Sequence, residues 1–336
     1  QKLEGKILNS NERDLKRVSE RFSLDLRDVK VRSNIFSAKY SLPQRLKETI
    51  KYDVIIFLSD GSIPWVLSKK LFIHIQQPLP FLKQSSINNL KKARVTSFFC
   101  NSFFTKSYID KVFKVESKVI YPPVEKKGKE QKKENIILTV GRFRVKNTDT
   151  NSKGKNENIF DYKKQGVMLN AFKDMVKKGL KEWKLIIATS VNNKEKVVFE
   201  LFKKRAQGFP IEFLVNKSNS ELWDIYSKAK IYWHAAGFGE NLNIHPEFAE
   251  HFGISTVEAM SAGVVPVVIN AGGQKEIVQE SENGLLWTTL EELKSKTLQL
   301  IKDPTLLKKL SVNSILSSQK YSEEKFCKGI NEMILE

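Results

Sequence analysis

The sequence is poor in the features that mark secreted and membrane-spanning proteins. Its 336 residues include two cysteines, Cys100 and Cys327, which is too few for a disulfide framework and favours a reducing, cytosolic setting. No apolar run approaches the roughly 20 residues of a membrane span, and runs such as 54–58 have the length of a core strand. No secretory signal peptide opens the chain. Because residue 1 is Gln rather than Met, we expect that the natural N-terminus is missing.

Acidic residues are absent from one long stretch of a chain whose net charge is +19. Residues 61–109 contain seven Lys and Arg and no Asp or Glu, and residues 1–120 contain 23 basic against 11 acidic residues. A generally lysine-rich composition would explain this excess. The alternative is an anionic partner for the N-terminal part, such as a phosphorylated lipid, a membrane surface or nucleic acid.

From residue 135 onward, short apolar runs alternate with amphipathic segments of helical length. This alternation predicts βαβ units and a parallel sheet covered by helices on both faces. The result is one doubly wound α/β domain with roughly six strands. The expected strands are 135–141, 183–190, 211–215, 231–236, 264–270 and 284–287.

The N-terminal third is less regular but of the same kind. We expect strands within 52–59, 70–76, 95–102 and 117–124. The charged stretch 122–135 has few apolar residues and is the best linker between two domains, predicted at 1–122 and 134–317. A polar insert, 146–158, follows the first strand of the second domain; it is either an active-site loop or sequence drift.

Side chains suited to phosphate follow the first strand of the second domain. That strand ends in Gly141 and Arg142, and its helix begins near Lys163 and Lys164. Such loops open at the carboxyl edge of a doubly wound sheet, where ligands bind. Because Arg grips phosphate oxygens with a planar fork and Lys adds a mobile charge, we predict a diphosphate cradle. Each residue alone also occurs in structural loops.

A glycine pair, Gly272 and Gly273, follows the strand at 264–270 and precedes Gln274. Glycine permits close backbone approach, and a helix start offers unpaired N–H groups to an anion. The pair therefore predicts a second contact to phosphate or sugar. An ordinary structural turn is the alternative.

Two glutamates, Glu250 and Glu258, flank Gly253 in the segment EHFGISTVEAM. Gly253 argues against one helix through both, so we place Glu250 before the helix and Glu258 in its second turn. Both then point at a ligand near the helix N-terminus, and paired carboxylates suit the hydroxyls of a polyhydroxylated ligand. Core-type neighbours such as Phe252 argue against the alternative of two solvated carboxylates, because buried carboxylates need partners.

Taken together, these motifs resemble glycosyltransferase family four, retaining enzymes of the GT-B fold. The family's E-x7-E motif is Glu250…Glu258, followed in the family's order by AGVVPVVINAGGQKEIV and NGLL. VGRF…KKQGVMLNAF resembles its phosphate-binding Arg…Lys segment. The segments EHFGI…VPVV and FIHIQQP are most similar to dolichol-linked α-1,2-mannosyltransferases and their prokaryotic relatives. The resemblance implies an α/β chain of two Rossmann-like parallel-sheet domains that face each other across a cleft.

This resemblance also implies roles for individual residues. Glu258 would hold the donor ribose, and Glu250 would lie beside the donor sugar. Arg142 and Lys163 would neutralise the departing diphosphate, and His74 would approach the sugar from the opposite domain. The catalytic residues would then be Glu250, Arg142, Lys163 and His74. The donor site would comprise Arg142, Lys163, Lys164, Glu250, Phe252, Gly253, Glu258, Gly272, Gly273 and Gln274.

The implied reaction moves a hexose, with mannose preferred, from GDP-mannose or a UDP-sugar to a glycan, a lipid-linked or another hydroxyl acceptor. Negative charge builds on the leaving phosphate, and fixed cations can stabilise it without a metal. His234, His245 and His251 match no common zinc spacing. We therefore predict no metal and no other cofactor, in a cytoplasmic protein that contacts the cytosolic membrane face peripherally.

The sequence also departs from the family. No glycine-rich loop precedes His74, so we expect the first strands of the N-terminal domain to be absent. At the other end, residues 318–336 resemble the family's helix that returns to the N-terminal domain. A sugar-nucleotide epimerase of the same fold and a basic nucleic-acid-binding module stay open as alternatives. The basic stretch lacks the regular aromatic interleaving of a stacking platform, so no nucleic-acid partner is expected. An anionic lipid-diphosphate acceptor fits it better.

Overall fold

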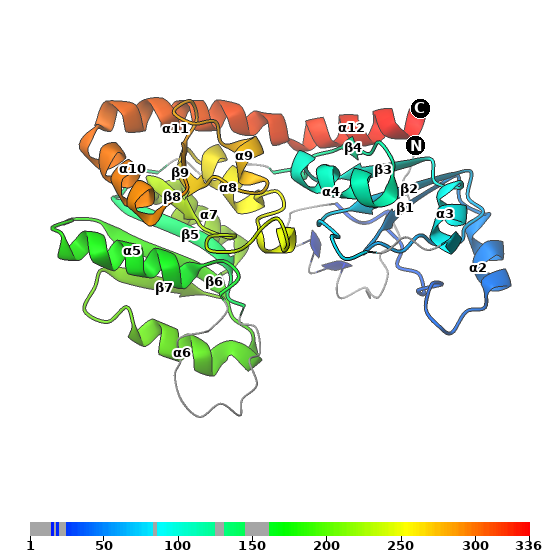
Figure 1. The fold of residues 1–336 in the computed structure, drawn as a ribbon, viewed down its shortest axis with the longest axis horizontal. Helices are drawn as coiled ribbons and strands as arrows, with labels where there is room; N and C mark the ends of the chain where they lie inside the picture. The colour runs from blue at the N-terminus through cyan, green and yellow to red at the C-terminus, as the bar shows by residue number, and fades with distance from the viewer. Residues whose placement is uncertain (1–14, 17, 20–24, 83–85, 125–130, 145–160) are drawn as a thin grey trace. The chain divides into compact units, whose positions relative to one another are not determined.

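The computed structural model describes the chain except residues 1–14, 17, 20–24, 83–85, 125–130 and 145–160. Its parallel strands form two sheets, with the orders β1-β2-β3-β4 and β10-β9-β8-β5-β6-β7; Figure 1 labels most of these strands and the helices that connect them. The prediction of two parallel-sheet α/β domains is therefore confirmed. The insert 146–158 and part of the proposed linker lie outside the described residues.

Two compact units make up the chain, one of residues 1–74 and 83–98, the other of residues 75–82 and 99–336. The division differs from the predicted domains because residues 99–122 are grouped with the C-terminal elements. One contact inside the second unit joins these segments: the carboxylate of Glu276 accepts hydrogen bonds from the backbone of Phe103 at 2.8 Å and of Phe104 at 2.5 Å. It thereby satisfies two N–H groups at the start of helix α4 (Phe103–Phe113).

The first unit holds helix α2 (Leu42–Thr49), strand β1 (Val54–Leu58), most of strand β2 (Lys70–Ile75) and helix α3 (Ser86–Lys92). Strand β1 pairs with β2 in parallel, with Leu58 opposite His74. At the end of α2, the buried hydroxyl of Thr49 accepts a hydrogen bond from the backbone of Leu67 at 3.1 Å. This bond ties α2 to the segment that precedes β2.

Strand β3 (Ser97–Cys100) pairs in parallel with the short β4 (Lys118–Val119), and these strands occur where the sequence predicts them. The C-terminal helix α12 (Glu323–Leu335) lies against the residues after β4: an added Cβ at Gly329 would be 3.5 Å from Ile120. Among the described helices, none is both long and apolar enough to cross a membrane.

Six parallel strands form the second sheet, in agreement with the predicted alternation. In chain order they are β5 (Ile136–Arg142), β6 (Lys184–Ser190), β7 (Ile211–Val215), β8 (Ile231–His234), β9 (Val265–Ile269) and β10 (Leu285–Trp287). The helices between and after them are α5 (Gln165–Lys177), α6 (Lys196–Lys204), α7 (Asn219–Lys228), α8 (Ile254–Ser261), α9 (Gln274–Ile277), α10 (Leu290–Lys302) and α11 (Pro304–Ser318).

Consecutive residues of these strands enter two different cores. Ile137 belongs to the core shared with α5, α6 and α10, whereas Ile136 and Leu138 belong to the core shared with α7 and α8. Both faces are buried, which explains why the strands read as continuous apolar runs rather than as alternating ones. Lys133 links the ends of two helices: its ammonium donates to the carbonyl of Ala229 at the end of α7, at 2.9 Å, and to that of Ala262 at the end of α8, at 2.7 Å.

Candidate functional site

The candidate site lies where the strand order of the six-stranded sheet reverses direction. From β5 the chain proceeds outward through β6 and β7, and it then returns to the other side of β5 with β8. The connections that leave β5 and β8 separate at their carboxyl ends, which opens a crevice where ligands bind in doubly wound folds. Arg142 is the last residue of β5, and His234 is the last residue of β8.

Glu250 is the centre of this site. Its Oε2 atom accepts hydrogen bonds from Lys163 Nζ at 2.5 Å and from His234 Nε2 at 2.8 Å. Burial raises the pKa of Glu250, but the charge of Lys163 and the hydrogen bond from His234 outweigh it and hold the pKa well below its ordinary value. Glu250 is therefore ionised at neutral pH, and its two partners fix its orientation.

His234 is a buried partner that the sequence alone did not reveal. Its side chain is 3% exposed, and burial lowers the pKa of the ring although Glu250 opposes this. A neutral ring that donates from Nε2 has an unprotonated Nδ1, and this atom has no hydrogen-bond partner within the described residues. The available signal was the position of His234 at the end of an apolar strand.

Lys163 reaches Glu250 along the backbone of Gly141. An added Cβ at Gly141 would be 3.0 Å from Cγ of Lys163, so a larger residue there would press on the lysine stem. The Lys163 ammonium lies 5.3 Å from the ring centroid of Tyr162, whose hydroxyl donates to the carbonyl of Glu247 at 2.9 Å. The pair Tyr162–Lys163 thus holds both the backbone and the carboxylate of the Glu250 loop.

Glu258 lies in the second turn of α8, as predicted, and is half-buried. Its Oε2 accepts a hydrogen bond from the hydroxyl of Tyr226 on α7 at 2.9 Å. Burial and the neighbouring carboxylate raise the pKa of Tyr226 far above its ordinary value, so the phenol is a neutral donor. Both glutamates therefore have hydrogen-bond donors within the protein, and the alternative of two solvated carboxylates is wrong.

The two other predicted phosphate ligands lie at either end of the connection between β5 and α5. Arg142 is exposed and forms no ion pair with any residue that the structure describes. Lys164 precedes α5 with a left-handed backbone, φ 55°, and its ammonium is paired with the carboxylate of Glu240. Their roles toward a diphosphate stay predictions.

The glycine pair is needed for contact between two loops. An added Cβ at Gly272, where φ is +59°, would be 2.4 Å from the backbone oxygen of Glu250. The N–H of Gly273 donates to that same oxygen at 2.7 Å. The N–H of Gly273 is therefore used within the protein, and the room left by the missing side chain at Gly272 is filled by the Glu250 loop; the predicted contact of the helix start with phosphate or sugar stays a prediction.

Three further members of the predicted donor site are largely buried. The Phe252 side chain is 2% exposed and packs against the rings of Tyr121 and Tyr321, so only its backbone is left for a ligand. Gly253 immediately precedes α8 with φ +124°, and Gln274 packs over it. The amide of Gln274 is fully buried, and neither of its polar atoms has a partner within the described residues.

His74 belongs to the first unit, in β2, and burial lowers its pKa to about 4. Its predicted approach to the donor sugar stays a prediction. The three clustered histidines do not share one ligand position: His234 contacts Glu250, whereas His245 contacts the carboxylate and His251 the backbone carbonyl of Glu247. In the part of the chain that the structure describes, no group of three His, Cys, Asp or Glu residues has the arrangement of a metal site.

The chain has the GT-B class of fold: it has two parallel-sheet domains, and the side chains that could bind a ligand lie at the switch point of the second sheet. Anabaena HepE in complex with UDP matches the chain with a TM-score of 0.68 at 16% identity, over 96% of this chain and 89% of that one. A glycosyltransferase from Rickettsia africae matches with a TM-score of 0.70 at 14% identity, over 98% and 89%. At such identities the similarity concerns the fold alone.

The family model described as "Glycosyl transferases group 1" matches residues 156–316, which lie in the second unit. The matched residues include Lys163, Glu250 and Glu258. A GDP-Man:Man(3)GlcNAc(2)-PP-Dol alpha-1,2-mannosyltransferase from Dictyostelium discoideum is 29% identical in an alignment of 188 residues that covers 52% of this chain. The chain covers 33% of that relative's length.

Proposed function

We propose that this chain is a glycosyltransferase that moves a hexose from a nucleoside diphosphate sugar to a hydroxyl acceptor. The observation that carries the proposal is the arrangement at the switch point: an ionised Glu250 joined to Lys163 and His234, with Glu258 one helix turn into α8. Carboxylates accept hydrogen bonds from sugar hydroxyls, and fixed cations suit a diphosphate. The match to the group 1 family model supports this assignment.

In the proposed reaction, Arg142 and Lys163 stabilise the negative charge that develops on the leaving diphosphate. Arg142 is exposed at the end of β5 and is available to a ligand. We propose retention of configuration and no requirement for a metal, so a chelator should leave the rate unchanged. Arg142→Ala should lower kcat more than donor affinity, whereas equal losses in both would make the arginine a binding group only.

GDP-mannose is the proposed donor, with UDP-sugars as the next candidates. The relative from Dictyostelium carries GDP-Man in its name, and its similarity to this chain extends over 52% of the residues. HepE, in contrast, was solved with UDP, but its 16% identity supports the fold rather than the base. A direct comparison of nucleotides is therefore the decisive experiment.

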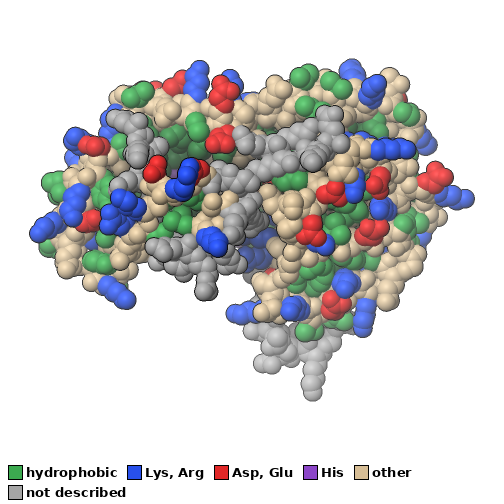
Figure 2. Space-filling model, turned by 180° about the vertical axis from the view of Figure 1, so that it is seen from behind, with side chains coloured by type: hydrophobic (Ala, Val, Ile, Leu, Met, Phe, Trp, Pro, Cys, Tyr) green, Lys and Arg blue, Asp and Glu red, His purple; other side chains and the backbone are tan. Residues whose placement is uncertain are grey.

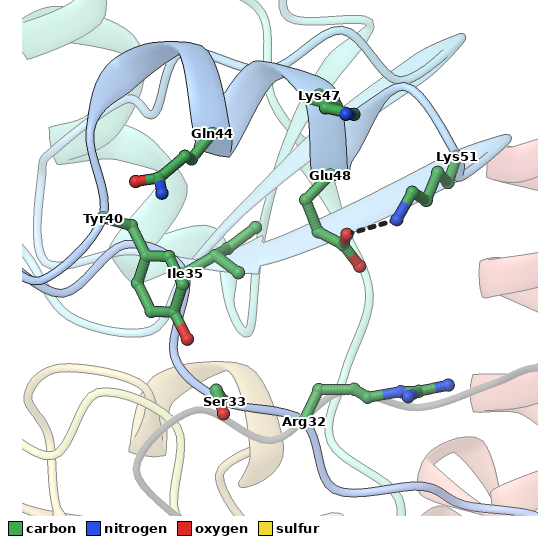
Figure 3. Close-up of a pocket in the computed structure, with 8 residues that line it drawn as sticks. All are labelled: Arg32, Ser33, Ile35, Tyr40, Gln44, Lys47, Glu48 and Lys51. Carbon is green, nitrogen blue, oxygen red and sulfur yellow. Dashed lines mark hydrogen bonds and ion pairs between the residues drawn. The ribbon is translucent and has the colours of Figure 1, made fainter.

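An anionic acceptor is supported by a pocket in the first unit, shown in Figure 3. The pocket has a volume of about 340 Å³, and its charged residues are Arg32, Lys47, Lys51 and Glu48. Glu48 pairs with Lys51 at 2.7 Å, which leaves an excess of positive charge in the pocket. Tyr40, Ile35, Ser33 and Gln44 complete the lining.

We propose that this pocket binds the phosphate of a lipid-linked acceptor. Arg32→Ala should then raise KM for a lipid-diphosphate acceptor several-fold and leave donor affinity unchanged. Arg27→Ala is the matched control, since Arg27 is exposed and pairs with the neighbouring Asp25. Equal effects of the two substitutions on KM would exclude the pocket as the binding site of the acceptor phosphate.

Peripheral contact with an anionic, cytosolic membrane surface is the proposed localisation. Helix α3 exposes 60% of Ile87 and 64% of Leu90 beside Lys91 and Lys92, a combination that suits an anionic lipid surface. On the face drawn in Figure 2, Lys and Arg alternate with Asp and Glu and with apolar patches rather than forming a continuous basic stripe. Binding to liposomes that contain anionic lipid should exceed binding to neutral ones; equal binding would contradict the proposal.

Calorimetric titration of GDP, UDP and ADP tests the donor assignment. We expect one nucleotide to bind, and Glu258→Ala to weaken its binding about tenfold or more because a hydrogen bond to a carboxylate is lost. Glu200→Ala, on the exposed side of α6, is the control that should change nothing. Absence of binding by all three nucleotides would contradict the proposed function.

A further inference from the structure

Glu250 has two hydrogen-bond donors on one oxygen. Lys163 and His234 both bind Oε2, whereas Oε1 makes no hydrogen bond within the described residues. Lys163 is a cation in this arrangement, and His234 is a buried ring whose Nδ1 atom is unpartnered in the described structure. The site therefore contains one charged partner of the carboxylate and one partner that can become charged.

A donor diphosphate would compete with Glu250 for Lys163. The lysine ammonium is a compact charge on a flexible four-carbon stem, and the diphosphate of a nucleotide sugar carries two negative charges against one on the carboxylate. Lys163 lies two residues before α5, and its stem packs on Gly141 beside the end of β5, where the diphosphate is proposed to bind. Movement of the ammonium toward that ligand would leave Glu250 buried without its cation.

We propose that Lys163 and His234 alternate as the counter-cation of Glu250. Without donor, Lys163 neutralises the carboxylate; when the diphosphate draws Lys163 away, His234 Nδ1 takes a proton from solvent and the imidazolium neutralises it. The Nε2–H bond to Glu250 is kept throughout, so His234 acts as a positioning residue that holds the carboxylate oriented toward the sugar. This inference rests on the proposed function.

The electrostatics of the pair favour such an exchange. The charge of Lys163 lowers the pKa of His234, and the charge of Glu250 raises it. Departure of the ammonium removes the first effect and keeps the second, and the incoming diphosphate adds negative charge nearby. Both changes, the loss of the ammonium and the arrival of the diphosphate, favour the protonated ring over the neutral one.

Other titratable groups around the pair are Arg142, Tyr162, Tyr232, Glu247 and His251. The arginine stays charged, and burial raises the pKa of both tyrosines well above their usual range, so they stay protonated. Glu247 lies in the loop and accepts from His245. His251, whose Nε2 lies 3.2 Å from the carbonyl of Glu247, is the group most able to imitate the proposed proton uptake.

Proton uptake on donor binding can be measured with the full chain. GDP-mannose and UDP-glucose would be titrated calorimetrically at pH 7 in two buffers of small and large ionisation enthalpy. The diphosphate diester of a nucleotide sugar has no group that titrates between about pH 5 and 8, so any buffer dependence comes from the protein. We expect the binding heats to differ by an uptake of up to about one proton per donor bound.

Variants identify which residue takes up the proton. His234→Gln should abolish the uptake, whereas the matched control His251→Gln should keep it. Lys163→Met should also abolish it, because the counter-cation is already absent before the donor binds; this variant serves if His234→Gln does not fold.

Each other outcome is informative. Binding of wild type with a buffer-independent heat, or uptake that disappears with His251 rather than with His234, would overturn the exchange and leave the proposed function standing. Failure of both nucleotide sugars to bind would overturn the proposed function, and the exchange with it.

Discussion

Replacement of Lys163 by methionine tests whether Glu250 depends on its lysine for stability as well as for function. Methionine keeps most of the apolar stem and removes the charge that lies 2.5 Å from Glu250 Oε2. Both side chains are 17% exposed, so this is a largely buried ion pair. Its loss leaves a buried carboxylate with only the imidazole of His234.

The expected destabilisation follows from this geometry. Removing one partner of a buried ion pair costs about 3–5 kcal/mol. The pair is not fully buried and the hydrogen bond from His234 remains, so we expect about 2–3 kcal/mol at pH 8. With the lysine gone, the pKa of His234 rises, and the folded variant binds a proton as pH falls.

The sign of the pH dependence is therefore defined. In wild type, burial holds the pKa of His234 below its unfolded value, so wild type loses stability as pH falls through that unfolded value. In the Lys163→Met variant the folded protein keeps His234 protonated at higher pH, so it does not lose this stability as the pH falls. The difference between the two proteins should shrink by about 1 kcal/mol from pH 8 to pH 6, the equivalent of less than one pKa unit.

Urea unfolding followed by tryptophan fluorescence measures this difference. Four of the five tryptophans are buried in the second unit: Trp183, Trp223, Trp233 and Trp287. Lys164→Met is the matched control, since Lys164 pairs with Glu240 at similar exposure and no histidine bonds to Glu240 in the described structure. Its cost should not vary between pH 6 and 8. A pH-independent cost for Lys163→Met as well would refute the reasoning.

Three further predictions concern packing and titration, each measured by unfolding. Phe172→Ala should cost about 3–5 kcal/mol because Phe172 is fully buried under the sheet, whereas Val197→Ala, at a 75% exposed position, should change stability by less than about 0.5 kcal/mol. Gly272→Ala should cost more than Gly179→Ala: both have positive φ, but only at Gly272 does the added Cβ meet a backbone oxygen, at 2.4 Å. Burial lowers the pKa of His74 to about 4 in the folded protein, so the free energy of unfolding should fall as the pH drops from about 6.5 to 4. His74→Gln should flatten this pH dependence; an unchanged slope would contradict the burial of His74.

Much of the fold was predictable from the spacing of apolar residues. Strands β5 to β10 occur at the expected positions because each is an uninterrupted apolar run, and a strand buried on both faces requires such a run. Helix starts such as Ser218, which accepts from the backbone of Glu221, also follow local capping rules. The boundary of the compact units did not follow from sequence, because it depends on contacts between distant segments, such as the two hydrogen bonds that Glu276 accepts from the start of α4, 172 and 173 residues away.

For the candidate site, the sequence correctly placed Glu250 before a helix and Glu258 in its second turn. It did not reveal which groups satisfy these carboxylates. His234 and Tyr226 are separated from them by 16 and 32 residues, and their side chains meet only after β8 and α7 have packed. The glycine pair was read correctly as a close backbone approach, but the partner is the Glu250 loop.

The sequence by itself determined the class of fold and the chemical types available at the carboxyl edge of the sheet, since both depend on local periodicity and on residues that follow strands. The tertiary structure alone decided that Lys163 and His234 share one oxygen of Glu250, and that the Gly273 N–H serves a neighbouring loop. The reason is physical: hydrogen-bond partners and pKa values depend on distances of a few ångströms between elements far apart along the chain, and sequence spacing does not encode those distances.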